Sequence, residues 1–368
     1  MIRSAALLIV LCLLPSSSPA QSAPNIRNPV INTESAEGAL LAQAGTSEDP
    51  AQKIQFLETF VEKFSNHEAI GYVYFQLHGL YLGQQDFAKS AEYGKKVVAL
   101  APDDLEVRDS NIKALAGAQQ WDEMLVNAAE AKAAADKGPA DQAEFAQGML
   151  QSIAYTLYTA AYQIPEPAPK IKLVETLRQH FPDSEYTKLS GEPLATAYQQ
   201  AGEYEKMLEA MREHLTHDAS NEVFLYTLAD AHARKNELEP AKQYADQLIQ
   251  LMAQKEKPEG VDDAAWAQQK TLFTALGNFV LGRILVTQEK YREGRAILLQ
   301  TVDPLKAQGG DAYGTLAYFL GICYVKLDIQ GDNIAAARNW MSVASNTPSA
   351  YQAEAKTILS KLPRVERR

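Results

Sequence analysis

The sequence contains very little cysteine, with Cys12 and Cys323 alone among 368 residues. Such a chain has no disulfide framework and must be stabilised by core packing, for which 46% hydrophobic residues are sufficient. It also lacks any Asn-x-Ser/Thr acceptor for N-glycosylation. For an exported protein, both absences fit a bacterial cell envelope better than a eukaryotic secretory pathway.

Motifs that carry chemistry are absent as well. The sequence has no phosphate-binding loop, no Gly-x-Ser-x-Gly, no His-Glu-x-x-His and no Cys-x-x-Cys. His214 and His217 are close in sequence, but zinc needs three or four ligands, so we interpret both as surface residues at a helix end. Cys323 lies on an apolar helical run, which indicates a buried, unreactive thiol. We therefore predict no enzyme, no catalytic residue, no cofactor and no metal site.

Large basic patches are missing too. The net charge is −11, and the acidic and basic residues are interspersed. Nucleic acids and anionic membrane surfaces are bound by basic patches, so both kinds of partner are disfavoured. The basic cluster of Arg364, Arg367 and Arg368 is interpreted as a solvated chain end.

The first residues have the pattern of a targeting segment. Arg3 supplies a positive charge, residues 5–14 are an unbroken apolar run, and Ser18-Pro19-Ala20 places small residues where a signal peptidase cleaves. This run is half as long as a membrane-spanning helix, which needs about 20 residues. We predict cleavage after Ala20, a periplasmic or secreted protein, and no stable membrane insertion afterwards. A retained membrane anchor is the alternative.

Apolar residues recur at helical spacing almost throughout, and strictly alternating runs are absent, which predicts an all-α protein. Similar residues also recur at an offset of 34, as from Tyr81 to Leu115 and from Phe87 to Trp121. A later pair of segments shows the same offset. In these segments Leu194-Ala195, Tyr198 and Gly202-Glu203-Tyr204 match Leu228-Ala229, His232 and Asn236-Glu237-Leu238.

One segment shows the complete pattern. It places Tyr74, Leu77 and Tyr81 on one helix face, Asp86-Phe87 at a turn, the small Ser90 at a helix crossing, and Pro102 at the end. This order resembles the tetratricopeptide repeat. The resemblance implies an α-solenoid of helix-turn-helix repeats that forms a right-handed superhelix with a C-terminal capping helix.

The predicted organisation follows the chain in order. It comprises a signal peptide (1–20), a disordered mature N-terminus (21–31), a degenerate helix pair (32–68), the repeat array (69–348), and a capping helix with a basic tail (349–368). The array is interrupted by insertions near 163–170, where three prolines form a loop, and near 254–263, where Asp262 caps the following helix.

The resemblance also implies a concave groove lined by the first helix of each repeat, which binds a peptide or a partner helix. Equivalent inward positions of four repeats hold aromatic residues, and three further residues lie near them on the groove face. The predicted partner-binding residues are Tyr72, Phe75, Tyr226, Asp230, Phe279, Arg283 and Tyr318. Packing between neighbouring helices is the alternative for these aromatics. The carboxylate clamp of some family members, a Lys and Asn pair, is absent.

Three functions stay open on the sequence. The first is a non-catalytic scaffold or adaptor of the bacterial cell envelope that binds a protein or peptide. The second is a small-ligand receptor or enzyme with a pocket at the inserted loops. The third is a self-assembling structural component whose groove is filled by its own N-terminal segment or by a second copy. The sequence does not indicate the oligomeric state.

Overall fold

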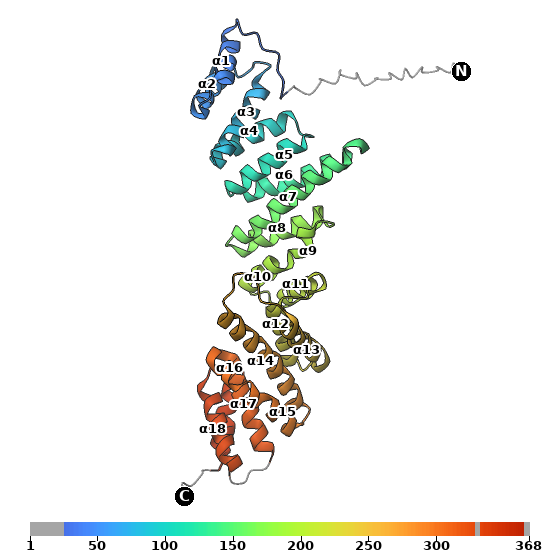
Figure 1. Cartoon of the computed structure of the whole chain (residues 1–368), viewed down its shortest axis with the longest axis vertical. Coiled ribbons are helices and arrows are strands. Elements are labelled where there is room, and N and C mark those ends of the chain that lie inside the picture. The colour runs from blue at the N-terminus through green and yellow to red at the C-terminus, as the bar shows by residue number, and fades with distance from the viewer. Residues whose placement is uncertain (1–25, 328–331, 364–368) are drawn as a thin grey trace, which may run out of the picture. The chain divides into compact units, whose positions relative to one another are not determined.

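The computed structural model describes residues 26–327 and 332–363, so the predicted signal peptide (1–20) lies outside the described residues. Every regular element of the described chain is a helix, which confirms the all-α prediction (Figure 1). The chain divides into two compact units. Among described residues, unit 1 comprises 26–160 and 176–182, and unit 2 comprises 161–175 and 183–363.

Each unit consists of short helices that succeed one another along the chain. Unit 1 contains α1 (Ala36–Thr46), α2 (Pro50–Lys63), α3 (Ile70–Gly83), α4 (Phe87–Leu100), α5 (Leu105–Gly117), α6 (Trp121–Lys137) and a 3₁₀ turn (Ala140–Gln142). The unit boundary falls within α7 (Ala143–Gln163) and α8 (Pro167–His180). Unit 2 contains α9 (Glu185–Leu189), α10 (Gly191–Ala201), α11 (Tyr204–His217), α12 (Glu222–Arg234), α13 (Leu238–Gln254), α14 (Asp263–Thr287), α15 (Tyr291–Gln300), α16 (Val302–Gln308), α17 (Gly310–Lys326), α18 (Asp332–Asn346) and α19 (Gln352–Lys361).

Consecutive helices pack as pairs, and within each unit each pair packs on the next. The pairs are α1/α2, α3/α4 and α5/α6 in unit 1, and α10/α11, α12/α13, α14/α15 and α17/α18 in unit 2. The last helix, α19, packs on α18 and α17, and its Ala355 is fully buried. This succession of helix pairs is the arrangement that the tetratricopeptide resemblance predicts.

Five helix pairs share one turn. A residue with positive φ stands two positions before the second helix in each, at Gln85, Gln119, Gly202, Asn236 and Glu289. The next residue donates its backbone N–H to the carbonyl five positions earlier, at 2.9 or 3.0 Å. This 6→1 bond is the Schellman geometry, which satisfies a carbonyl at the helix end. The 34-residue offset therefore reflects a repeated backbone turn, and residues 85 and 119 and residues 202 and 236 are separated by it.

Small residues allow the two helices of a pair to approach closely. A Cβ atom on Gly282 would lie 2.6 Å from Leu298 on α15, and one on Gly321 would lie 2.8 Å from Met341 on α18. Both separations are shorter than van der Waals contact, so a larger residue would push the helices apart. Gly282 and Gly321 each follow a leucine, in the pairs Leu281-Gly282 and Leu320-Gly321, and these Leu-Gly positions thus have a packing reason.

The structure differs from the sequence-based expectation at two segments. Residues 26–31, expected to be disordered, include Ile26, which is 4% exposed and packs against Val97 and Val107. Residues 165–169 were expected to form a loop, but α8 begins at Pro167. Proline is tolerated in the first turn of a helix because the N–H it lacks has no intrahelical partner there. Asp262 caps α14 as expected, accepting from the N–H groups of Ala264 and Ala265.

No described helix, within residues 26–327 and 332–363, has the length and apolar composition needed to cross a membrane.

Candidate partner-binding surfaces

The predicted groove residues belong to two different units. Tyr72 and Phe75 lie on α3 of unit 1, and both are half-buried. The other five lie on α12, α14 and α17 of unit 2. Each group is therefore a separate candidate site.

In unit 1, Phe75 is covered by the segment that precedes α1. The guanidinium carbon of Arg27 lies 5.5 Å from the centre of the Phe75 ring, within cation–π range. The same guanidinium donates to both carboxylate oxygens of Asp104 and, at 2.7 Å, to Glu106. These contacts, led by the hydrogen bond to Asp104, raise the pKa of Arg27. Asp104 also caps α5 by accepting from the Val107 N–H at 3.2 Å.

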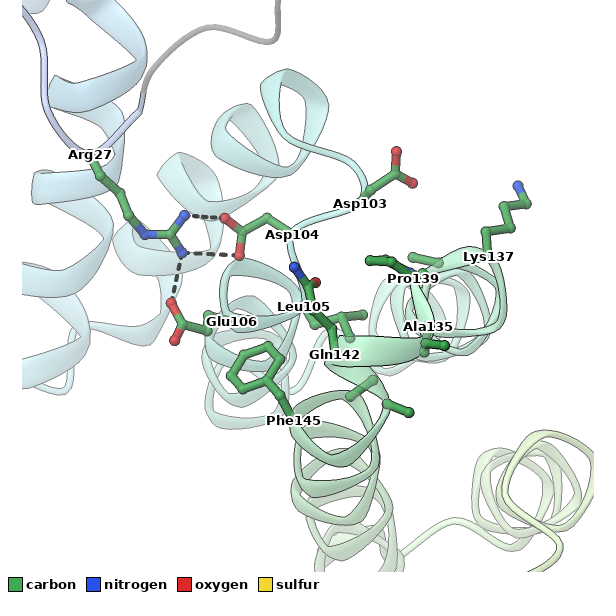
Figure 2. Close-up of a pocket in the computed structure, with 15 residues that line it drawn as sticks. Arg27, Asp103, Asp104, Leu105, Glu106, Ala135, Lys137, Pro139, Gln142 and Phe145 are labelled. Atoms are coloured by element: carbon green, nitrogen blue, oxygen red, sulfur yellow. Dashed lines mark hydrogen bonds and ion pairs between the residues drawn. The ribbon is translucent and has the colours of Figure 1, made fainter.

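A cavity of about 810 Å³ extends from this ion pair, and we call it the acidic pocket (Figure 2). It lies where α5 begins, α6 ends and α7 begins, and Arg27, Asp103, Asp104, Glu106 and Phe145 line it. Figure 2 shows the Arg27 ion pairs at one side of the cavity and Lys137 at the other. Phe145 is 45% exposed, so an aromatic ring is available to a ligand there. The pocket therefore combines an acidic rim with an apolar wall.

In unit 2, Asp230, Arg234, Arg283 and Asp311 form an ionic network, which we call the Asp230 cluster. Asp230 on α12 accepts from Arg283 on α14 and from Arg234 one turn later on its own helix. Arg234 also pairs with Asp311 at the start of α17. The side chain of Arg283 is 2% exposed, and that of Asp230 is 16% exposed. The cluster links three first helices of successive pairs inside the unit.

Two aromatic rings contact the Arg283 guanidinium of this cluster. The guanidinium carbon of Arg283 lies 5.2 Å from the Phe279 ring centre and 5.4 Å from that of Phe319. Phe279 is 1% exposed. Tyr226 packs against the cores on both sides of it, and burial raises its pKa. Four predicted unit 2 residues are thus brought together: Tyr226, Asp230, Phe279 and Arg283.

Tyr318 belongs to the core cluster that also contains Phe279. Its ring stacks on Tyr351 at 4.5 Å, and burial, together with a hydrogen bond to Glu354, raises its pKa. It is 7% exposed. The burial of Phe279, Arg283 and Tyr318 favours helix packing, the alternative that the sequence left open for the aromatics, over direct contact with a partner.

Several residues of these sites were not singled out from the sequence. Arg27, Asp104 and Glu106 are far apart along the chain, and no local pattern joins them. Arg234 is a partial exception, since an acidic residue four positions before an arginine on a helix is a recognised ion-pair spacing. Asp311 meets Arg234 only because α12 and α17 both contact the long helix α14.

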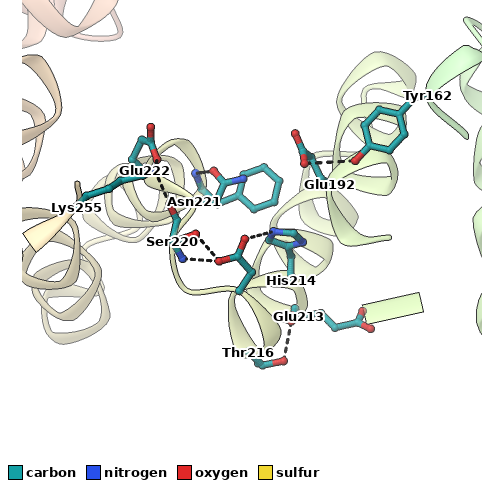
Figure 3. Close-up of polar contacts among 11 residues, drawn as sticks. Tyr162, Glu192, Glu213, His214, Thr216, Ser220, Asn221, Glu222 and Lys255 are labelled. Atoms are coloured by element: carbon teal, nitrogen blue, oxygen red, sulfur yellow. Dashed lines mark hydrogen bonds and ion pairs between the residues drawn. The ribbon is translucent and has the colours of Figure 1, made fainter. Parts of the chain in front are cut away.

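The histidine pair near the end of α11 does not form a metal site. His214 is 3% exposed, so its predicted surface position is wrong, whereas His217 is exposed as predicted. Figure 3 shows His214 beside the turn that precedes α12. Its Nε2 atom lies 3.9 Å from Asp218, and its ring meets Phe224 edge-on. Among the described residues, no group of three or more His, Cys, Asp or Glu side chains could hold a metal.

Cys323 is fully buried on α17, and burial raises the pKa of its thiol to about 12. A thiol with such a pKa stays protonated at neutral pH and is a poor nucleophile. The prediction of a buried thiol is confirmed.

Two solved structures of helical repeat proteins show a weak similarity to this chain. The structure of yeast Tom70 has 13% sequence identity to this chain, covers 90% of it and 88% of that chain, and gives a TM-score of 0.28. The tetratricopeptide domain of P58(IPK) has 13% identity, covers 89% of this chain and 98% of that chain, and gives a TM-score of 0.29. No family model matches the sequence, and no curated protein matches it. At these TM-scores neither likeness carries an argument, so the fold assignment rests on the chain's own helix pairs and turns. The described chain is an all-α array of tetratricopeptide-like helix pairs.

Proposed function

We propose that this protein is a non-catalytic scaffold or adaptor of the bacterial cell envelope that binds a peptide or a partner helix. The observation that carries the proposal is the acidic pocket, a cavity of about 810 Å³ with an exposed aromatic wall in an array of helix pairs. Such a volume is within the range of ligand-binding clefts, on the order of 300–1,000 Å³. An aromatic anchor with charged groups at the rim is a common composition of protein interfaces.

The charge of the pocket indicates the chemistry of its partner. Three carboxylates, Asp103, Asp104 and Glu106, line the pocket with two cations, Arg27 and Lys137, which leaves one net negative charge. Asp104 and Glu106 are paired with Arg27, and Asp103 stands beside them. A peptide with basic and apolar side chains complements this surface, and such complementarity raises the rate of association. The envelope location is supported by the targeting pattern of residues 1–20, by the scarcity of cysteine and by the missing sequon.

The test is capture of a partner from envelope extract by the full chain carrying an affinity tag. Phe145→Ala and Phe75→Ala should each reduce the captured partner several-fold, as truncation of an aromatic anchor does. Leu299→Ala on α15 is the control, because Leu299 is 43% exposed and lies in the other unit. Equal capture by all three variants, or no specific partner, would contradict the proposal. Tyr226→Ala is less informative, since Tyr226 packs against three core clusters and its loss also reduces stability.

A self-assembling component is the second candidate, because the segment around Arg27 already covers the groove residue Phe75. A receptor or enzyme at the inserted loops has less support, since no residue lining the acidic pocket comes from 163–170 or 254–263.

A further inference from the structure

The segment that leads into α1 places two consecutive residues on α3, α4 and α5. Ile26 inserts among Val97, Val107 and the half-buried Phe75, and its Cγ2 atom would lie 3.1 Å from a Cβ on Gly71. Arg27 then spans from the Phe75 ring to the carboxylates of Asp104 and Glu106. Residues 26–31 belong to no helix. The segment therefore contacts unit 1 through side chains, as an extended peptide contacts a groove.

Unit 2 also has a guanidinium between an aromatic ring and a carboxylate, but there the arginine lies on the same helix as the ring. Phe279 and Phe75 hold equivalent positions of their repeats, and each ring faces a guanidinium at 5.2 or 5.5 Å. Arg283 lies four residues after Phe279 and pairs with Asp230. The position four residues after Phe75 is Gly79, which has no side chain and open space around it. Unit 1 thus presents an aromatic ring and carboxylates without an arginine on the same helix.

We infer that this face of unit 1 is a binding site for an extended peptide in which a branched aliphatic residue is followed by arginine. We call this face, made by Phe75, Val97, Asp104, Glu106 and Val107, the arginine site. In the structure its occupant is the chain's own Ile26-Arg27, which a partner of the same chemistry displaces. The inference rests on the proposed function and names the partner's recognition element.

The chemistry of the site selects arginine over lysine. Asp104 accepts two hydrogen bonds from Arg27 and Glu106 accepts a third, while the flat guanidinium faces the aromatic ring. A planar fork of donors suits this arrangement, whereas the compact ammonium of lysine does not. The aliphatic residue before the arginine is selected by the apolar lining of Val97 and Val107, both fully buried.

The polar half of the contact is partly exposed, whereas Ile26 is buried. The Arg27 side chain is 39% exposed and that of Glu106 is 56% exposed, so the ion pairs are partly screened by water. Eight residues, 28–35, separate Arg27 from Ala36, the first residue of α1. A tethered segment of this length has an effective concentration on the order of millimolar, so it competes strongly with any free peptide.

The experiment measures binding of a fluorescein-labelled peptide with residues 22–31 to the full chain by fluorescence anisotropy. The released variant carries Ile26→Asp and Arg27→Glu, which remove the tethered competitor. We expect it to bind the peptide about tenfold tighter, or more, than the wild type does. Circular dichroism confirms that the helices are retained. If the double variant loses helicity, Arg27→Glu alone replaces it, because this change is confined to a partly exposed side chain.

Two controls define the recognition element. Adding Asp104→Asn and Glu106→Gln to the released variant should lower its affinity for the peptide about tenfold, because charge-assisted hydrogen bonds are lost. Asparagine at position 104 still caps α5. A peptide with Arg27→Glu should bind neither protein. The inference would be overturned by equal affinity of the peptide for wild type and released variant, or by no binding to the released variant. It would also be overturned if neither the carboxylate substitutions nor the substitution in the peptide changed the affinity.

Two further outcomes separate this inference from others. Dimers of the wild type that disappear in Arg27→Glu would show that a second copy supplies the segment and would overturn the intramolecular assignment. Capture of an envelope partner that depends on Phe145 but not on Asp104→Asn would leave the scaffold function intact and overturn the arginine site.

Discussion

Helix α3 in unit 1 and helix α14 in unit 2 carry an aromatic residue at the same position of the repeat, Phe75 and Phe279. The surroundings of these two rings differ. In unit 2, Phe279 is buried beneath Arg283, whose charge is compensated by Asp230 within the core. In unit 1, Phe75 is half-buried, and its arginine is supplied by a segment from outside the helix pair. One repeat position therefore faces an arginine of its own helix in one unit and an arginine of the segment before α1 in the other. The difference depends on whether the helix carries its own arginine.

Replacing each arginine tests this difference most strongly. Arg283→Ala leaves Asp230 paired with Arg234 alone. Breaking a buried ion pair costs up to about 3 kcal/mol of unfolding free energy when one of two partners remains. Arg27→Ala removes an exposed ion pair and a cation–π contact, for about 0.5–1 kcal/mol. Urea unfolding followed by circular dichroism measures both. Comparable losses would remove the distinction between the two sites.

Glycine positions on the first helices provide the second test. Gly282→Ala should cost about 1–3 kcal/mol, because the new Cβ would lie 2.6 Å from Leu298. Gly79→Ala should instead stabilise α3 by about 0.5–1 kcal/mol, since nothing lies within 4 Å of the new Cβ. Thermal unfolding of the two variants gives the signs. A stabilising Gly282→Ala would contradict the close helix approach proposed for the Leu-Gly positions.

The repeated turn should behave alike in both units. Gln85 and Glu289 hold positive φ angles of 61° and 62°, which favour glycine. Glycine at either position should stabilise the protein by about 0.5–1 kcal/mol, and Gly202→Gln should destabilise it by a similar amount. Denaturant midpoints measure these effects. Opposite signs at Gln85 and Glu289 would show that the turns differ despite their common hydrogen bond.

Buried histidines make the stability of each unit depend on pH. Burial lowers the pKa of His78 in unit 1 and of His214 in unit 2 below 6.5. As the pH falls, these histidines therefore become protonated in the unfolded chain at a higher pH than in the folded chain. The stability that each neutral, buried histidine contributes is complete above pH 6.5 and declines as the pH falls below it. His78→Gln should flatten the dependence of the unfolding free energy on pH between 7 and 5. An unchanged slope would exclude His78 as a source of this dependence.

Much of the fold follows from the sequence because the repeat leaves a local signal. Phe87 and Trp121 are both first residues of second helices, and the 34-residue offset between them is kept in the structure. The positive φ angle in the turn could not be predicted from the sequence, since four of the five residues that adopt it there are not glycine. A shared backbone geometry is held there by packing and capping rather than by residue type.

The candidate sites were predictable only in part. The inward positions of the repeat located Phe75 and Phe279 correctly on first helices, but periodicity does not report how deeply a side chain is buried. The pairing of Arg27 with Asp104 joins residues 77 positions apart, and no helical or turn pattern encodes it. Such contacts depend on the tertiary course of the segment before α1. The segment was predicted to be disordered because chain termini are poorly ordered unless contacts hold them.

The most direct test of the account is site-specific photo-crosslinking in living cells from the wall of the acidic pocket. A photoreactive residue replaces Phe145 in the Arg27→Glu chain, and a second chain carries it at Leu299, a position of similar exposure in unit 2. We predict a discrete product from position 145, cross-linked to a segment with an aliphatic residue followed by arginine, and none from position 299. No product at position 145, or the same product at both, would contradict partner binding through unit 1.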